Sequence, residues 1–406
     1  MTTTTTAIRL ASRAAHLPPS ATAALDAHAK HLIASGVDVI NLTSGEPAFP
    51  TVEPAARAAA AAIEEDFTRY TPAAGIPELR TAVAAYLNRH ATSYAAEDVV
   101  ITAGAKQALH YAFNVLLDQG DEVLIPAPYW VSYPHMVTLA GGVPVEVHPA
   151  PDGGLKITPD QVRKAITPRT RVLLLNSPAN PSGAVYTRDE LAALADVAVE
   201  HDLTLISDEI CDHWVYGSAF TSVAALSPEV AARTLTIGGV SKTFAMTGWR
   251  IGWVAAPASV AKVISAVQSH TASAPSSISQ RAALGALTAD LEEELDKRRA
   301  ALDERRRSTL QALAAVPGVR VDADARGAFF VFADVSGTYG HRVGDRTITS
   351  AADFAELLLA RAKVAVVPGA DFAAPDHVRI SYTVPPERLS EALERIAGFV
   401  TTLTRG

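Results

Sequence analysis

The chain of 406 residues contains a single cysteine, Cys211, so no disulfide can form within it. This cysteine usage is compatible with a reducing compartment, and we expect the protein to be cytoplasmic. The sequence also lacks any apolar run long enough to cross a bilayer, so we predict no membrane segment. Basic residues (35) are fewer than acidic ones (43), and the net charge of −8 argues against a general nucleic-acid or anionic-membrane surface.

The sequence around Lys242 is similar to a phosphate-binding P-loop, but the glycine that this motif requires directly before the lysine is absent. Ser241 occupies that place before Lys242 and Thr243, which excludes the P-loop motif. Lys242 instead lies among small and apolar residues after an apolar run. Burial in such surroundings lowers the pKa of a lysine and favours the free amine that forms a Schiff base. The alternative from this motif alone is an ordinary lysine in a surface turn.

Short apolar runs alternate with helix-period segments through the middle of the chain. Uninterrupted β-branched runs separated by helices predict an α/β fold with a mostly parallel sheet covered on both faces. The predicted strands are Val99–Ile101, Glu122–Ile125, Val143–Val147, Arg171–Leu175, Thr204–Ile206, Thr234–Ile237 and Ile251–Ala255. We expect Gly238 and Gly239 to end the strand that starts at Thr234.

The pattern changes beyond Leu291 and predicts a second domain. Leu291–Leu313 has blocks of acidic and basic residues, which indicate a solvated helix that connects two domains. We predict a large domain at 51–295 and a smaller α+β domain at 296–406. The N-terminal segment 1–50 is expected to join the small domain, with a frayed tip at Thr2–Thr6.

Candidate site residues follow the predicted strands. In open α/β sheets, ligands bind beyond the carboxyl ends of the strands. Five residues of functional types occupy such positions: Gly104, Trp130, Asn180, Asp208 and Lys242. We therefore expect them to meet in one site.

Taken together, these stretches resemble the class I aminotransferases, which are fold-type-I enzymes dependent on pyridoxal 5′-phosphate (PLP). The resemblance runs from Pro19 to the last helix and is closest to bacterial aspartate and prephenate aminotransferases. The stretches that carry it are Pro19–Thr22, Ser44–Pro47, Tyr70–Arg80, Pro128–Pro134, Asn176–Gly183, Ser207–Ile210 and Ser241–Gly252. It implies a mostly parallel sheet between helices in a large PLP-binding domain, a smaller α+β domain, and a homodimer with shared active sites.

The resemblance implies how the cofactor ring is held. Lys242 would carry PLP as an aldimine and, once freed, shuttle a proton between Cα and C4′. Asp208 would face the pyridine nitrogen and keep it protonated. Asn180 would donate to the phenolic oxygen, and Trp130 would stack on the ring. The ordinary alternatives are a helix N-cap for Asp208, a turn residue for Asn180 and a core residue for Trp130.

The resemblance also implies a cofactor phosphate at the start of a helix. The backbone amides of Gly104, Ala105 and Lys106 would point toward it, where the positive helix end suits an anion. Arg250 would pair with the phosphate in fork geometry. Tyr70 would reach it from the partner subunit.

Substrate recognition is implied in the same way. Arg379 would bind the α-carboxylate, and Lys106 would bind a distal carboxylate with Thr22 nearby. Lys106 as a solvated lysine stays an open alternative. The remaining substrate contacts implied are Gly45, Asn180 and Trp130. The expected substrates are dicarboxylic amino and 2-oxo acids; no metal site is predicted.

Two departures from the family pattern concern the reaction. Cys211 stands where a tyrosine normally donates to the phenolic oxygen, and a thiol is a weak donor. Ala274 stands where an asparagine is common. The leading hypothesis is a ping-pong aminotransferase; the alternative is a PLP-dependent lyase, replacement, cyclisation or carbon–carbon bond-forming enzyme acting on substituted amino acids such as S-adenosylmethionine. A DNA-binding regulator of this fold is disfavoured, because the family pattern begins by Pro19 and the protein is acidic.

Overall fold

The computed structural model describes residues 21–150, 154–321 and 325–405, together with positions 8, 10, 11, 15, 17 and 18. The predicted tip Thr2–Thr6 and the first residues of the N-terminal motif, Pro19 and Ser20, lie outside the described residues. Among the described residues, no helix combines the length and the apolar character that crossing a bilayer requires.

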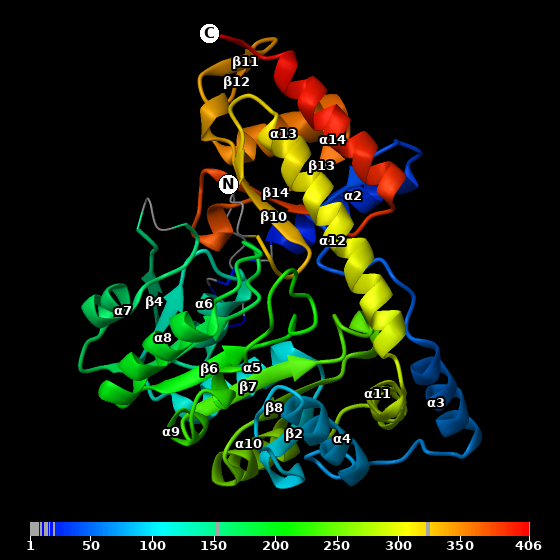
Figure 1. Cartoon of the computed structure of the whole chain (residues 1–406), viewed down its shortest axis with the longest axis vertical. Coiled ribbons are helices and arrows are strands. Elements are labelled where there is room, and N and C mark those ends of the chain that lie inside the picture. Colours follow the sequence, from blue (N-terminus) through cyan, green and yellow to red (C-terminus); the bar gives the residue numbers. More distant parts are fainter. Residues whose placement is uncertain are drawn as a thin grey trace.

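A seven-stranded sheet forms the centre of the larger part of the molecule (Figure 1). Its order is β2 (Val99–Thr102), β8 (Gly252–Ala255), β7 (Thr234–Gly239), β6 (Thr204–Asp208), β5 (Thr170–Asn176), β3 (Glu122–Pro126) and β4 (Val143–Val147). Neighbours from β7 to β4 are parallel, and β8 is antiparallel to both β2 and β7. The predicted mostly parallel sheet is confirmed.

Both faces of the sheet are covered, because successive side chains of a strand point to opposite faces. In β5, Val172 and Leu174 belong to one hydrophobic cluster, whereas Leu173 and Leu175 belong to another. Helices α5 (Ala105–Leu116), α6 (Ser132–Leu139) and α10 (Ala258–Thr271) contribute to the first cluster, and α7 (Pro159–Ala165) and α8 (Arg188–Glu200) to the second. A third cluster packs α3 (Glu53–Glu64), α4 (Pro77–Asn88) and α11 (Ser277–Thr288) against β2 and β8. The short α9 (Pro228–Ala231) precedes β7.

Strand β7 continues through Gly238 and Gly239, so the predicted end of this strand was wrong. Gly238 pairs with Trp253 of β8, and Gly239 pairs with Gly252. A Cβ atom at Gly238 would lie 2.5 Å from Nε1 of Trp253. Glycine therefore extends the strand here, because only a residue without a side chain allows the two strands to pair beside the indole.

The C-terminal part is built around an antiparallel sheet of β14 (Val367–Pro368), β15 (His377–Ser381), β10 (Phe330–Asp334) and β9 (Arg320–Val321). Helices α13 (Ala351–Ala362) and α14 (Pro386–Thr401) pack on it. A three-stranded sheet of β12 (Arg346–Thr347), β11 (His341–Val343) and β16 (Thr404–Arg405) lies at its far end. This part has the mixed α and β composition that the sequence predicts.

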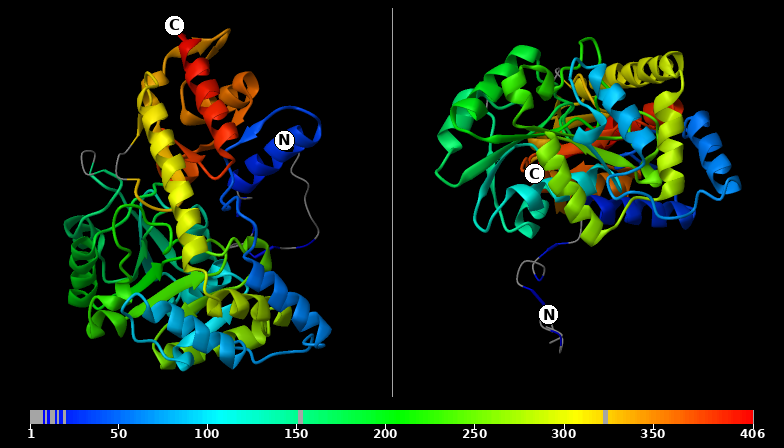
Figure 2. Two further views of the ribbon diagram at one scale, coloured as in Figure 1. Left: turned by 45° about the vertical axis from the view of Figure 1, so that its right-hand side comes forward. Right: turned by 90° about the horizontal axis from the view of Figure 1, so that it is seen from below.

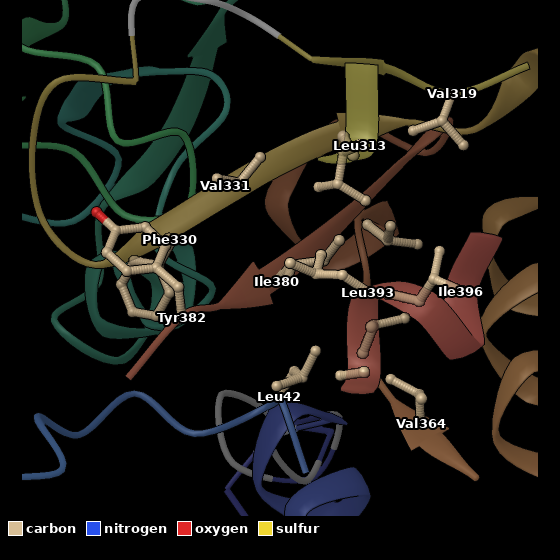
Figure 3. Packing of buried hydrophobic residues seen from close by; sticks show 14 of the residues in the cluster. Leu42, Leu313, Val319, Phe330, Val331, Val364, Ile380, Tyr382, Leu393 and Ile396 are labelled. Atoms are coloured by element: carbon tan, nitrogen blue, oxygen red, sulfur yellow. The ribbon is translucent and has the colours of Figure 1, made fainter. Parts of the chain in front are cut away.

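The N-terminal segment joins this C-terminal part. Strand β1 (Ile40–Asn41) pairs in parallel with β13 (Val364–Ala365). Helix α2 (Ala21–Ala34) lies beside them (Figure 2). Figure 3 shows Leu42 in the same core as Ile380 of β15 and Ile396 of α14. The exact domain boundaries at residues 50 and 295 stay predictions.

Helix α12 (Glu292–Ala314) runs from the larger part into the C-terminal part (Figure 1). The prediction of a solvated helix is correct only for one side of it. Leu295, Leu302 and Leu313 are buried, and Arg298 is buried against the ring of Phe49. The sequence analysis did not predict this apolar face, because the residues that form it are widely spaced among arginines and carboxylates.

Candidate active site

A cavity of about 350 Å³ opens between the carboxyl ends of the parallel strands and the C-terminal part. Most of the predicted site residues line it: Gly45, Ala105, Lys106, Trp130, Asn180, Asp208, Cys211, Lys242, Arg250 and Arg379. Two predicted residues are not in the cavity lining: Gly104, where an added Cβ atom would lie 2.4 Å from Nη2 of Arg250, and Tyr70, which projects into solvent. The side chain of Thr22 in α2 lies outside the described part of the chain.

Lys242 lies in the loop that follows β7, and its amine points into the cavity. The Nζ atom donates a hydrogen bond of 2.6 Å to the carbonyl oxygen of Gly45. Burial lowers the pKa of the Lys242 amine, and Arg379 and Arg250 lower it further, whereas Glu46 acts in the opposite direction. A lowered pKa increases the fraction of free amine, which is the form that reacts with carbonyl groups.

Asp208 is the last residue of β6, is buried and lines the same cavity. Tyr133 donates its hydroxyl hydrogen bond to Oδ2 at 2.7 Å, and the backbone N–H of Ile210 donates to Oδ1 at 3.2 Å. Burial raises the pKa of the Asp208 carboxyl, although both hydrogen bonds and the charge of Lys242 act against this. The two donors hold the carboxyl group in one orientation at the cavity wall.

Tyr133 is a site residue to which the sequence analysis assigned no role. It lies in the first turn of α6, three residues after Trp130, and the two rings meet edge to face with centroids 5.3 Å apart. The signal was present in the Pro128–Pro134 stretch, in which Tyr133 follows Trp130 by three residues. Tyr133 thus connects the aromatic wall of the cavity to the Asp208 carboxyl.

Asn176 is a second residue that the sequence analysis left without a role. Its Nδ2 atom donates to the carbonyl oxygen of Asp208 at 2.9 Å, and its Oδ1 atom accepts from the backbone N–H of Asn180 at 2.9 Å. Asn176 therefore fixes the loop that presents the Asn180 side chain. The side chain of Asn180 in turn accepts from Nη1 of Arg379 at 2.9 Å.

Arg379 enters the cavity from β15 and is only 2% exposed. Its Nη2 atom donates to the carbonyl oxygen of Thr43 at 2.8 Å, and its guanidinium lies 4.4 Å from the ring of Phe330. The Nε atom has no hydrogen-bond partner within the described structure. Burial lowers the pKa of Arg379. A buried guanidinium with an unused donor is suited to a carboxylate ligand.

The part of the cavity beside the start of α5 has the features of an anion site. Gly104 precedes α5 with φ +86°, and a Cβ atom there would lie 2.4 Å from Nη2 of Arg250. Arg250 is held in the left-handed region (φ 58°) and donates to the carbonyl oxygen of Thr247 at 2.8 Å. Lys106 of the first turn of α5 places Nζ 4.7 Å from the Trp130 ring. A helix N-terminus beside two basic side chains favours a bound anion.

Cys211 lines the cavity, whereas Ala274 does not. Burial raises the pKa of the Cys211 thiol to about 12. The thiol is therefore neutral at physiological pH and is a weak hydrogen-bond donor at this position.

A family model described as aminotransferase class I and II matches residues 37–396. The chain belongs to this family. The aminotransferase is 44% identical over 395 residues to the aspartate aminotransferase of Geobacillus stearothermophilus, covering 97% of this chain and 99% of that one. It is 45% identical over 391 residues to the aspartate/prephenate aminotransferase of Thermus thermophilus, covering 96% and 98% of the two chains.

Solved structures agree with this assignment. The crystal structure of the aspartate aminotransferase from Rhizobium meliloti superimposes with a TM-score of 0.93 at 39% identity, covering 98% of this aminotransferase and all of that chain. The fold-type-I architecture and the aminotransferase activity predicted from the sequence are confirmed. The roles of individual cavity residues stay predictions.

Proposed function

We propose that this aminotransferase depends on PLP and moves an amino group between an acidic L-amino acid and a 2-oxo acid in a ping-pong cycle. We further propose that it acts as a cytoplasmic homodimer with shared active sites. The observation that carries the proposal is one cavity that contains an amine, a carboxyl and a guanidinium, contributed by Lys242, Asp208 and Arg379.

The cavity residues fit this cofactor. At the Gly104 end, the absence of a side chain leaves room for Arg250 beside the first amides of α5. The backbone N–H groups of Ala105 and Lys106 and the guanidinium of Arg250 would hold the phosphate, with Tyr70 of a partner subunit. The N–H of Gly104, which the sequence analysis assigned to the same role, donates to the carbonyl oxygen of Thr102 at 2.8 Å. Trp130 and Asn180 would hold the ring and its phenolic oxygen, together with the thiol of Cys211.

When bound, PLP supplies an aldehyde that condenses with amines and a ring that accepts the electron pair released at Cα. Lys242 would hold the aldehyde carbon and then carry the proton that leaves Cα, since its amine has a lowered pKa. Asp208 would stabilise a protonated ring nitrogen, and Tyr133 holds its carboxyl in place for this interaction.

Two cations would orient the substrate. Arg379 would bind the α-carboxylate with donors that include the unused Nε, and Asn180 fixes the position of Nη1. Lys106 lies at the cavity wall beside Trp130, where its amine would attract a distal carboxylate. The names of the relatives, aspartate and aspartate/prephenate aminotransferase, support an acidic substrate. Gly45 and Thr22 complete the proposed substrate contacts.

The test is half-transamination by the purified holoenzyme without any 2-oxo acid. Aspartate and glutamate should convert the cofactor to its amine form and release one oxo acid per site, and leucine should react far more slowly. Lys106→Ala should reduce the preference for aspartate over leucine about tenfold, as expected for one lost ion pair. No conversion by any amino donor would contradict the proposal, and an unchanged preference in Lys106→Ala would indicate a solvated lysine.

A second activity on the same scaffold is favoured by one observation, namely that Cys211 lines the cavity. A thiol holds the phenolic oxygen less firmly than a tyrosine, which leaves elimination, replacement or carbon–carbon bond formation open. The holoenzyme should then release the leaving group of amino acids substituted at Cβ or Cγ, S-adenosylmethionine included. Transamination without such release would exclude this activity, and Cys211→Tyr should shift the outcome toward transamination.

A further inference from the structure

A buried carboxylate outside the cavity joins three segments of the larger part. Oδ1 of Asp212 accepts from the Thr243 hydroxyl at 3.2 Å and from the backbone N–H of His213 at 2.8 Å. Oδ2 accepts from the Tyr86 hydroxyl at 2.7 Å, and Nε2 of His90 lies 3.4 Å from it. Asp212, Tyr86 and Thr243 are all buried.

The position of this carboxylate in the chain connects it to the site. Asp212 directly follows Cys211, and Thr243 directly follows Lys242. The hydrogen bond between them therefore joins the turn after β6 to the loop after β7, which carries the reactive lysine. Neither Asp212 nor Thr243 lines the cavity. Two backbone hydrogen bonds in this loop are local and long, namely Phe244 N–H to Val240 at 3.3 Å and Ala245 N–H to Lys242 at 3.4 Å. The ends of the loop are held from outside, since the Val240 N–H donates to Ile251 at 3.2 Å and the Thr51 hydroxyl donates to the Ala245 carbonyl oxygen at 3.1 Å.

The charge state of Asp212 suits this connection. Burial would raise the pKa of Asp212, but the neighbouring His90 and the hydrogen bond from the Tyr86 hydroxyl hold it below its ordinary value. An ionised carboxylate accepts stronger hydrogen bonds than a neutral group. A buried one is stable only while such partners remain, so its donors are held in fixed places.

We propose that Thr243 and Asp212 are positioning residues of this aminotransferase, whose hydrogen bond holds the loop so that the Lys242 amine stays against Gly45 inside the cavity. The proposal rests on the proposed role of Lys242. With the bond intact, the Lys242 amine is shielded from water and is surrounded by five charged or titratable groups. These groups are Glu46, Asp208, Cys211, Arg250 and Arg379. Without it, the loop loosens and water reaches the amine, which raises the lysine pKa toward its ordinary value.

The first test compares Thr243→Val with Thr243→Ser by steady-state kinetics. Thr243→Val should lower kcat about tenfold, which is the rate equivalent of one lost hydrogen bond. KM should be unchanged, because the substrate contacts stay in place. Thr243→Ser retains the hydroxyl and should restore kcat. The matched control is Thr236→Val in β7, which removes a buried hydroxyl that pairs with Tyr94 at 2.9 Å but does not touch the loop. Its kcat should equal that of the unchanged protein.

The second test measures the pH dependence of Lys242 labelling in the cofactor-free full-length protein. Acetic anhydride labels free amines, and peptide mass spectrometry follows the labelling of Lys242 against pH. The labelling midpoint should rise by about one pH unit in Thr243→Val and return in Thr243→Ser, since loosening weakens desolvation. Thr243→Ala replaces Thr243→Val if the latter does not fold.

These outcomes separate the two proposals. If Thr243→Val matches Thr236→Val in both kcat and midpoint, the positioning role is wrong, whatever Lys242 does. If the midpoint moves but unchanged protein forms no reducible adduct with PLP at Lys242, the hydrogen bond positions the lysine and the proposed cofactor role is wrong.

Discussion

At the scale of single residues, burial moves two site groups toward their neutral forms. It lowers the pKa of the Lys242 amine and raises that of the Asp208 carboxyl. The Tyr133 hydroxyl and the Ile210 N–H oppose the second shift. Removing Tyr133 would leave the Asp208 carboxyl with fewer donors and a higher pKa, so this tyrosine maintains the charge that the proposed chemistry needs.

Glu209, the neighbour of Asp208, is a buried acid outside the proposed chemistry. Its Oε1 atom accepts from Ser207, Ser222 and the Val223 N–H, yet burial raises its pKa from 4.5 to about 7. Because the folded pKa lies above the unfolded one, Glu209 stabilises the fold at low pH, and this stabilisation is lost as the pH rises through about 7.

Glu209→Gln should therefore reduce the loss of unfolding free energy between pH 5 and pH 8 by about 2 kcal/mol, measured by urea unfolding at both values. The amide keeps an acceptor oxygen but does not ionise. Glu65→Gln, at the exposed end of α3, is the matched control and should leave the pH dependence unchanged. Parallel pH profiles for Glu209→Gln and the unchanged protein would show that Glu209 ionises freely in the fold.

The sequence predicts the residues whose chemical type is tied to a motif, such as Lys242, Asp208 and Arg379, and they share one cavity. It does not predict Tyr133, Asn176 or Asp212 as partners. Their contacts join segments that are far apart in sequence, and a tyrosine, asparagine or aspartate has many ordinary uses in a fold. Only the packed structure shows which of them point at the same carboxylate or loop.

At the scale of elements, the site depends on how closely β8 approaches the start of α5. Gly252 of β8 pairs with Thr102 on one side and Gly239 on the other. A Cβ atom at Gly252 would lie 2.3 Å from the Ala105 nitrogen and 2.5 Å from the Gly104 carbonyl carbon. The helix N-terminus can reach its place only because position 252 has no side chain.

Gly252→Ala should displace the start of α5 and raise the dissociation constant for PLP at least about tenfold, because the phosphate amides move. Titration of cofactor-free protein by absorbance measures this. The control is Gly398→Ala in α14, where an added Cβ meets no atom within 4 Å. It should leave PLP affinity unchanged and stabilise the helix by about 1 kcal/mol. Equal affinities for the two variants would remove α5 from the proposed phosphate site.

Most elements follow from the sequence, because apolar β-branched runs and helix periodicity are local signals. The predicted elements differ from the observed ones where tertiary contacts determine the local conformation. Strand β7 passes through Gly238 and Gly239 because β8 pairs with them, and α12 buries one side because both parts of the molecule pack on it. The composition of β8 likewise gives no indication that this strand runs antiparallel to β2 and β7.

At the scale of the whole molecule, the proposed contact of Tyr70 with the cofactor phosphate would be made in the site of a partner subunit. Tyr70 is 96% exposed and lies outside the cavity. In a two-fold dimer, the same surface of each subunit can complete the site of the other.

Mixing two defective variants tests this arrangement. Tyr70→Ala and Lys242→Ala should each be impaired, but a hybrid dimer contains one site with both native residues. Activity after the two variants are unfolded and refolded together should exceed the sum of the separately refolded variants. An activity equal to that sum would place Tyr70 outside the partner's site.

The central claim is that Lys242 holds the cofactor covalently. The most direct measurement is borohydride reduction of the protein supplied with PLP, followed by mass spectrometry of its peptides. The account predicts a reduced pyridoxyl adduct on the peptide containing Lys242 and its disappearance in Lys242→Ala. An unmodified Lys242 peptide, or an adduct confined to another lysine, would contradict it.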